Sequence, residues 1–263
     1  MGKTTNALEK VVHSYFENKE QFPKKFEAVR SNHHQIISGL FSKDKVLVTQ
    51  KIDALFDEAL SFLFNNTVDN YSLVYDQVVS VGELVSTTII SHFMRHEEIE
   101  NLWLDARKCV KTDTYYRDAN LDWNKTKTQI LEMVQGNTTL ISQGFIGSAP
   151  NGMTTTLGRE GSDYSAAIFA YALEADSVTI WKDVPGVLNG DPREFEDPVL
   201  LNQISYREAI ELAFYGASVI HPKTLQPLQR KEIPLYVKSF ENPKDPGTAV
   251  SKGKILEPYV PCY

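Results

Sequence analysis

The chain has 263 residues, of which 42% are hydrophobic and 23% are charged, and its formal net charge is −7. This length is sufficient for one large α/β domain with a buried core. The negative charge argues against nucleic acid or an anionic membrane surface as the main partner, because both require a basic face. It does not exclude a phosphorylated ligand, which a few local basic side chains and backbone N–H groups can hold.

Two cysteines, Cys109 and Cys262, are the only ones in the sequence. Their wide separation indicates a reducing compartment, with neither a disulfide framework nor a paired-cysteine metal site. No window approaches about 18 uninterrupted apolar residues, and the polar start does not resemble a signal peptide. We therefore expect a cytoplasmic protein without a membrane span.

Apolar residues recur at helical spacing in four stretches of the first hundred residues, which predicts a helical N-terminal half. Thr4 and Thr5 are candidate N-caps of the first helix. The four helices are expected at residues 4–16, 26–40, 52–64 and 71–96.

Strands alternate with helices after residue 100, which predicts an α/β fold with a mostly parallel sheet between helices. Strands are expected at residues 102–104, 177–181 and 235–237, and a buried strand running into a glycine turn at 139–147. Helices are expected at 162–175, 204–215 and 221–231. The Pro- and Gly-containing tail from Asn242 onward indicates an exit from the domain.

The densest polar and glycine-rich segment spans residues 154–167, directly before a predicted helix. Backbone N–H groups at a helix start form an anion site, and Arg159 adds a planar donor fork that suits carboxylate or phosphate. The segment is neither a Walker A loop nor a GxGxxG fingerprint. On local chemistry alone, Ser162 or Asp163 as a simple N-cap is an equally good interpretation.

Two further segments contain ordered glycine, proline and charged residues. Residues 181–193 follow a predicted strand, which is where α/β proteins place ligands, although Asn189-Gly190 alone predicts a plain hairpin turn. In residues 215–224, His221 stands before Pro222 at a helix start. A single histidine there favours a structural hydrogen bond over catalysis, because nothing nearby completes a nucleophile–base pair.

These three segments together resemble the aspartate kinase branch of the amino acid kinase family. Its motifs read TTLGRGGSD-Y-[ST]-A, W-T-D-[VI]-[DP]-G-[IV]-Y-x-x-D-P-R and [FY]-G-A-K-V-[IL]-H-P. Residues 80–87 similarly resemble its S-x-G-E-x-x-S-T helix, and residues 143–147 its Q-G-F-I-G strand end. The resemblance covers nearly the whole chain and implies a three-layer αβα sandwich, amino acid kinase-like, with a mainly parallel central sheet.

The resemblance also implies an activity, namely ATP-dependent phosphorylation of the side-chain carboxylate of L-aspartate. The product is 4-phospho-L-aspartate, in the first step of lysine, threonine and methionine biosynthesis. ATP with Mg²⁺ is the implied cofactor. A homodimer is expected, and fusion to ACT and homoserine dehydrogenase domains is expected of some full-length members. Two alternatives stay open: another amino acid kinase such as glutamate 5-kinase, and a non-catalytic amino-acid-binding remnant.

Site residues follow from the resemblance by position. Arg159 is expected to clamp the α-carboxylate of the substrate, and Glu83 to face its amino group. Asp163 matches an acidic residue near the transferred phosphoryl group, so Arg159 and Asp163 are the catalytic candidates. The aspartate-binding set comprises Thr5, Glu83, Phe145, Arg159 and Ser162. The nucleotide-binding set comprises Asp183, Gly186, Leu188, Arg193 and Ser218. No metal ligand is expected from the protein.

Departures from the family motifs include Ser218, Leu188 and Glu160. Ser218 replaces the lysine of G-A-K-V, which removes a cation near the phosphates, and Leu188 replaces a common tyrosine. Glu160 stands at a common glycine position, where we expect an outward-pointing, solvated side chain.

The motifs also set the expected domain limits. Residues 1–250 are expected to form a catalytic domain that lacks the K-F-G-G-T-S loop, and residues 251–263 an exit segment before absent ACT domains. We therefore expect impaired activity.

Overall fold

The structure is a computed structural model that describes residues 3–136, 138–191, 193–214, 219–253 and 258. The chain folds as two compact units, Met1–Gly161 and Ser162–Tyr263. Each unit has its own hydrophobic core. The boundary falls within the glycine-rich segment 154–167, so the expected single domain contains two units.

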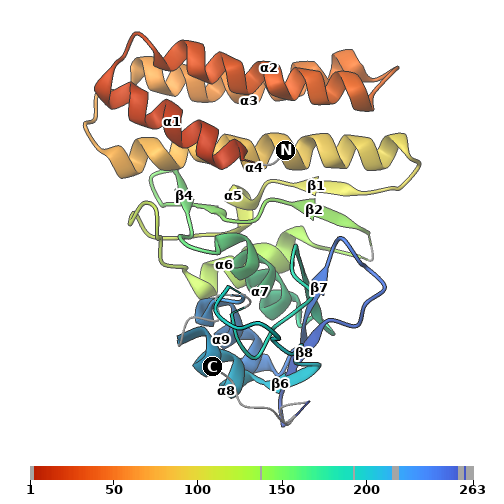
Figure 1. The fold of residues 1–263 in the computed structure, drawn as a ribbon. Coiled ribbons are helices and arrows are strands. Elements are labelled where there is room, and N and C mark those ends of the chain that lie inside the picture. The colour runs from red at the N-terminus through yellow and green to blue at the C-terminus, as the bar shows by residue number, and fades with distance from the viewer. Residues whose placement is uncertain (1–2, 137, 192, 215–218, 254–257, 259–263) are drawn as a thin grey trace. The chain divides into compact units, whose positions relative to one another are not determined.

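Four long helices dominate the first unit, and Figure 1 shows them side by side in red to yellow. Their periodic apolar residues share one core, in which Phe26, Ile52 and Phe56 are fully buried. The helical N-terminal half is therefore confirmed. The helices are α1 (Thr4–Glu17), α2 (Phe22–Leu40), α3 (Lys45–Asn65) and α4 (Tyr71–His96).

Helix α4 is the central helix of the first unit. The Asn70 side chain caps its start by accepting a hydrogen bond from the backbone N–H of Leu73 at 3.0 Å. Arg95 and His96 lie in its last turn, where positive charge is favourable. By length and composition α4 could cross a bilayer, but 72% of its apolar window is buried inside the protein. This burial is that of a core helix.

Short strands and helices follow α4. Strands β1 and β2 pair in parallel, and β3 and β4 pair antiparallel. The strand expected to run into a glycine turn over residues 139–147 ends at Ser142, and Phe145, with a φ of 72°, interrupts the extended backbone before β3. The elements are β1 (Leu102–Leu104), α5 (Ala106–Cys109), α6 (Trp123–Met133), β2 (Leu140–Ser142), β3 (Ile146–Ser148) and β4 (Thr154–Thr156).

Side chains of α4 hydrogen-bond to β4 along the edge that β3 does not occupy. Gln77 donates to the carbonyl of Thr154 at 2.8 Å and accepts from its N–H at 3.0 Å. Asp76 accepts from both the N–H and the hydroxyl of Thr156 at 2.8 Å, and from the N–H of Arg117 at 3.0 Å. Asp76 and Thr156 are fully buried, so these bonds satisfy groups that water cannot reach.

The second unit contains a four-stranded sheet in the order β5-β7-β8-β6. Pairs β5–β7 and β6–β8 are parallel, and β7–β8 is antiparallel. Sheet and helices share a core that includes the fully buried Leu201, Leu225 and Leu235. The elements are α7 (Gly161–Leu173), β5 (Val178–Lys182), β6 (Gln203–Ser205), α8 (Tyr206–Phe214), α9 (Pro222–Lys231), β7 (Leu235–Ser239) and β8 (Thr248–Ser251).

The helix expected at residues 204–215 is confirmed as α8, although its first two residues, Ile204 and Ser205, belong to β6 and pair with β8. The tail from Asn242 is not an exit, because β8 lies between β7 and β6 with Thr248 and Val250 buried. One mainly parallel central sheet is not found in the described residues, whose short strands form three small sheets. The α/β class itself holds.

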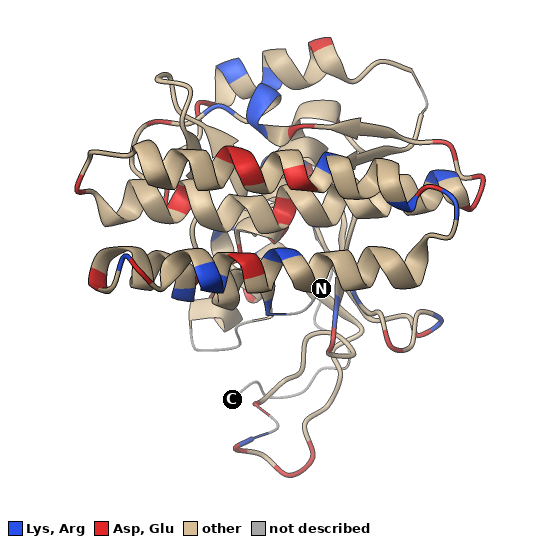
Figure 2. Ribbon diagram, turned by 90° about the horizontal axis from the view of Figure 1, so that it is seen from above, with Lys and Arg blue, Asp and Glu red and all other residues tan. Residues whose placement is uncertain are grey.

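Charged residues of both signs are interspersed along the helices of the first unit, as Figure 2 shows from above. Arg30 pairs with Asp57, and the imidazole of His34 lies 2.7 Å from a carboxylate oxygen of Asp53. Because Asp57 is exposed and His34 and Asp53 are partly exposed, such pairs each contribute about 0–1 kcal/mol. Their main effect is to keep the outer helical faces polar.

We predict that Asp76→Asn destabilises the protein by about 2–3 kcal/mol, because an amide cannot accept all three hydrogen bonds and leaves buried donors unpaired. Burial raises the pKa of Asp76 to about 6, although its donors oppose this rise. Chemical unfolding at neutral pH measures the loss. Asp69→Asn, at an exposed position just before α4, is the control. Equal unfolding midpoints for the two variants would contradict the prediction.

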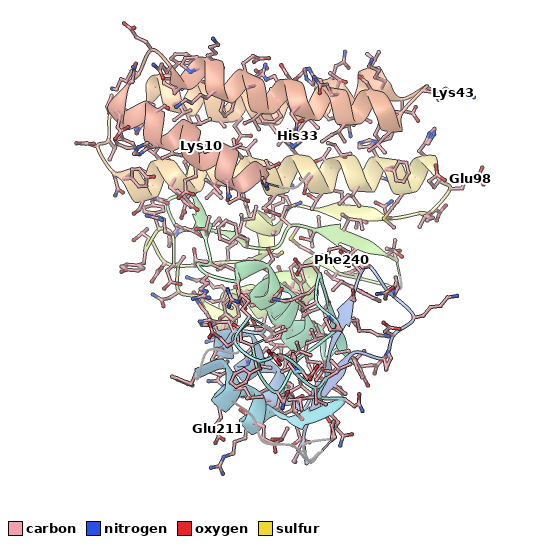
Figure 3. All side chains as sticks on the ribbon, in the orientation of Figure 1. Lys10, His33, Lys43, Glu98, Glu211 and Phe240 are labelled. Carbon is pink, nitrogen blue, oxygen red and sulfur yellow. The ribbon has the colours of Figure 1, made fainter. Side chains whose placement is uncertain are left out.

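A second prediction concerns His33, which Figure 3 labels inside the helical layer. Its Nδ1 lies 2.8 Å from the carbonyl of Val29, and its buried Nε2 has no hydrogen-bond partner among the described residues. Burial lowers the pKa of His33 below 6.5. On acidification, His33 therefore binds a proton more readily in the unfolded chain than in the folded chain. The folded protein accordingly loses stability as the pH falls through 6.5.

His33→Leu is accordingly expected to reduce the loss of unfolding free energy between pH 7.5 and pH 5. Urea unfolding at the two pH values provides the comparison. His13→Leu is the control, since the His13 side chain is 63% exposed. The idea fails if all three proteins lose the same stability on acidification.

Candidate functional site

Glu83 and Thr5 lie where α1 crosses α4 in the first unit. A Cβ atom added to Gly82 would lie 3.0 Å from Cγ2 of Thr4 and 3.3 Å from Cδ1 of Leu8, so the two helices approach closely at this glycine. The first turn of α1, with Thr5 exposed, therefore contacts α4 beside Glu83. The structure brings these two predicted aspartate-binding residues into one region.

The Glu83 carboxyl group is half-buried, and burial raises its pKa above the usual 4.5. Within the described residues it forms no ion pair. A desolvated carboxylate without a counter-ion favours a cationic ligand, because a nearby positive charge offsets the cost of desolvation. Glu83 is thus suited to hold an ammonium group.

A buried hydrogen-bond network joins the α4 motif to the Q-G-F-I-G segment. Thr87 donates to the carbonyl of Glu83 at 2.8 Å, and it accepts from the Gln143 amide at 2.8 Å and the Trp103 indole at 3.1 Å. The side-chain Oε1 atom of Gln143 accepts from the backbone N–H of Ala106 at 2.8 Å. Two motifs that lie 56 residues apart therefore meet through Thr87 and Gln143.

Phe145 has a left-handed backbone with φ of 72°, which costs a bulky residue about 1–3 kcal/mol. Its side chain packs against the helical core, and its carbonyl accepts from the N–H of Leu157 at 2.8 Å. A Cβ atom on Gly161 would lie 2.7 Å from Cδ2 of the ring. Such strain typically accumulates at functional sites, because the surrounding packing holds the residue in place.

Arg159 lies between glycines that fix its loop. Gly158 has φ of 79°, and a Cβ atom there would lie 2.4 Å from a carboxylate oxygen of Asp118. The Arg159 side chain is exposed and forms no ion pair in the part of the chain that the structure describes. Its guanidinium is therefore available to an anionic ligand.

The expectation that Glu160 is outward-pointing and solvated is wrong. Its Oε2 atom is buried and has no hydrogen-bond partner among the described residues. The residue has φ of 53°, a left-handed conformation that glycine adopts without strain. The residue is only partly exposed, so at least one oxygen of its carboxylate is shielded from solvent.

In the second unit, Ser162 and Asp163 lie in the first turn of α7, which begins at Gly161. Neither is therefore the N-cap that local chemistry also allowed. Ser162 is exposed, whereas Asp163 Oδ2 lies 2.8 Å from the Nζ atom of Lys182, the last residue of β5. Sequence reasoning missed Lys182, although a lysine in place of the threonine of W-T-D was a visible signal.

Four predicted nucleotide-binding residues lie in the loop after β5: Asp183, Gly186, Leu188 and Arg193. Asp183 is exposed, and Leu188 bridges to Leu200, so Asn189-Gly190 is not a two-residue hairpin turn. Ser218 lies outside the described residues.

Gly186 is buried with φ of 153°, and a Cβ atom there would lie 2.5 Å from the hydroxyl oxygen of Thr248. That hydroxyl accepts from the N–H of Val187 at 2.8 Å and donates to the carbonyl of Leu201 at 2.6 Å. Strand β8 therefore anchors the Pro-Gly part of the loop.

Arg193 forms a two-pronged hydrogen bond with Asp191, at 3.0 Å and 2.6 Å. These bonds from Arg193 lower the pKa of Asp191 to about 2. His221 has the structural role that was expected, since its Nδ1 accepts from the N–H of Lys223 at the start of α9.

A cavity of about 820 Å³ in the first unit contains no predicted site residue. Its basic lining residues are Arg107, Lys108, Lys111 and Lys125. Among the described residues, no group of three or more His, Cys, Asp or Glu side chains could hold a metal ion.

Comparison with known proteins identifies the family. The model of the amino acid kinase family matches residues 2–239. The chain therefore belongs to the amino acid kinase family.

Particular relatives are aspartokinases. The chain is 35% identical over 231 residues to lysine-sensitive aspartokinase 3 of Escherichia coli K12, covering 86% of this chain and 51% of that protein. It is 30% identical to the chloroplastic bifunctional aspartokinase/homoserine dehydrogenase of Daucus carota, over 98% of this chain and 29% of that protein. The chain thus spans about half or less of the curated relatives' length.

Solved structures agree with the sequence relatives. Escherichia coli aspartokinase III in complex with aspartate and ADP matches 97% of this chain and 57% of that chain, with a TM-score of 0.87 and 33% identity. Aspartate kinase of Clostridium acetobutylicum matches 95% of this chain and 52% of that chain, with a TM-score of 0.73 and 26% identity.

Gly161→Ala is predicted to weaken binding of L-aspartate, the ligand implied by the resemblance, because the new methyl group displaces the Phe145 ring. A stability loss of about 1–3 kcal/mol should accompany it. Calorimetric titration and thermal unfolding provide the two measurements. Gly39→Ala in α2, where a Cβ atom meets nothing within 4 Å, is the control and should be stabilising. Unchanged aspartate affinity in Gly161→Ala would argue against a ligand contact of Phe145.

Proposed function

We propose that this chain is the catalytic part of an aspartate kinase, which transfers the terminal phosphoryl group of ATP to the side-chain carboxylate of L-aspartate. The observation that carries the proposal is the likeness of 97% of this chain to aspartokinase III in complex with aspartate and ADP. The arrangement of the predicted residues within each unit supports it.

Groups of the first unit suit the two charged ends of an amino acid. The half-buried Glu83 carboxylate complements the ammonium group, and the Arg159 guanidinium complements the α-carboxylate through two parallel hydrogen bonds. Thr5 and Phe145 are the further aspartate-binding residues of this unit, and Ser162 is that of the second. Holding both ends leaves the side-chain carboxylate as the reacting group.

The transfer step needs no general base, because the acceptor carboxylate carries no proton. The P–O bond to ADP breaks as a P–O bond to an aspartate oxygen forms, giving ADP and 4-phospho-L-aspartate. Catalysis then depends on positioning and charge neutralisation. Asp163 therefore acts by orientation rather than by proton transfer.

Mg²⁺ is proposed to arrive with the nucleotide. The phosphates of the nucleotide would hold most of such an ion's ligand positions. Asp183, Gly186, Leu188, Arg193 and Ser218 stay the proposed nucleotide-binding residues. Residues of the loop after β5 lie at the carboxyl end of a parallel strand, where α/β proteins bind ligands.

The complete protein is proposed to form a three-layer αβα sandwich and a cytoplasmic homodimer. Residues 1–250 are the proposed catalytic domain, and residues 251–263 a segment that leads out of it. Its reaction is the first step of lysine, threonine and methionine biosynthesis. Relatives that are bifunctional with homoserine dehydrogenase support the proposal that ACT and dehydrogenase domains accompany it in a full-length protein.

We predict that the chain binds L-aspartate more tightly than L-glutamate, and that Glu83→Gln weakens aspartate binding about 10- to 100-fold, or about 1.4–2.7 kcal/mol. Because burial raises the pKa of Glu83, wild-type affinity should fall on acidification before pH 4.5 is reached. Calorimetric titration over a pH series measures both effects. Glu97→Gln, an exposed carboxylate at the end of α4, is the matched control.

The outcomes separate the candidate functions. Tighter binding of glutamate favours a glutamate kinase and overturns the assignment. If the chain binds aspartate but forms neither ADP nor acyl phosphate, a non-catalytic amino-acid-binding protein is favoured. Hydroxamate trapping detects the acyl phosphate.

A further inference from the structure

Lys182 and Asp163 form a largely buried ion pair in the second unit. The Nζ atom of Lys182 lies 2.8 Å from Oδ2 of Asp163, and the two side chains are only 21% and 16% exposed. Lys182 ends β5 and pairs in register with Ser239 of the parallel strand β7. Asp163 lies in the first turn of α7. The ammonium group therefore lies where a parallel strand ends and a helix begins.

A purely structural role leaves this geometry incompletely explained. Removing a lysine and a carboxylate from water is costly, and a single contact seldom offsets the cost. An ammonium group has three donors, and Asp163 is the ion-pair partner that the described residues provide. The remaining donors and the residual exposure of Lys182 allow its ammonium group to bind a second anion.

The local charge also requires Lys182. Asp163 and Asp183 are both acidic and flank the carboxyl end of β5, so without Lys182 this end would carry two negative charges. The negative charges of the two carboxylates repel a nucleotide phosphate, whereas an ammonium group attracts it. Lys182 lowers the local negative charge and is the cation next to Asp163 that can attract a phosphate.

The sequence contains a matching exchange. The family motifs place threonine at position 182 and lysine at position 218, whereas this chain has Lys182 and Ser218. The number of lysines across the two motifs is thus conserved while the position changes. This exchange is read from the sequence alone. It therefore supports a role for Lys182 independently of the 2.8 Å contact between Lys182 and Asp163.

We propose that Lys182 is a catalytic residue that contacts the ATP phosphates and neutralises the phosphoryl group during transfer, and that Asp163 is a positioning residue that holds its ammonium group. This inference rests on the proposed aspartate kinase function. Lys182 gives up no proton and forms no bond in the step. Its contribution is electrostatic, and groups of this kind are worth about 10²–10³-fold in kcat.

The test replaces Lys182 by methionine, arginine or threonine in the full chain. Lys182→Met should lower kcat about 10²–10³-fold and leave the KM for aspartate within about threefold, whereas Lys182→Arg should retain most of the rate. Lys238→Met, on the neighbouring strand β7 and 5.8 Å from the Trp181 ring centre, is the matched control. Thermal unfolding of each variant separates a structural from a catalytic loss.

Nucleotide binding gives a readout that does not depend on aspartate. Lys182→Met should weaken ATP binding about 10-fold and leave AMP binding unchanged, because AMP lacks the β- and γ-phosphates. If Lys182→Met does not fold, Lys182→Thr, the residue typical of the family, takes its place in both measurements. Lys182→Thr combined with Ser218→Lys should regain at least 10-fold of the lost rate.

Two results overturn the inference. In the first, the wild type is active and Lys182→Met leaves kcat unchanged. In the second, Lys182→Met lowers the affinities for ATP and AMP equally. The first leaves the aspartate kinase function intact. A different outcome separates the two proposals. If the wild-type protein does not phosphorylate aspartate, the aspartate kinase function is refuted. If Lys182→Met nevertheless lowers the affinity for ATP but not for AMP, the contact between Lys182 and the phosphates still holds.

Discussion

The hydrogen bonds that the side chains of Asp76 and Gln77 form with β4 are the constraint on which the first unit depends. They provide to one edge of β4 what a neighbouring strand provides in an ordinary sheet, and β3 occupies the other edge. The site loop starts directly after Thr156, so any displacement of β4 relative to α4 is transmitted to Arg159. Because Glu83 is two helical turns further along α4, one rigid helix sets the position of both charged groups.

The strain at Phe145 is consistent with this arrangement. A left-handed bulky residue persists only where its surroundings determine it, and here Gly161, Leu157 and the helical core do so. The buried Thr87–Gln143 contact fixes the backbone just before Phe145. Polar side chains at buried positions thus hold the loop geometry, while apolar side chains supply the bulk of the core.

Sequence patterns predicted the long helices and the site motifs because apolar periodicity and glycine spacing are local signals. They failed for β6 and β8, which are only three and four residues long and owe their structure to partners distant in sequence. The shielded carboxylate oxygen of Glu160 and the Lys182–Asp163 pair also escaped prediction. Both depend on where a side chain points, which backbone conformation and tertiary contacts decide.

Thr248 has a consequence for the order in which the second unit can fold. Its hydroxyl holds the backbone of Val187, 61 residues earlier in the chain. The loop after β5 therefore cannot reach its final form on the ribosome until β8 has been synthesised. Such non-local closure is slow compared with helix formation, so the proposed nucleotide loop is among the last parts of the unit to become ordered.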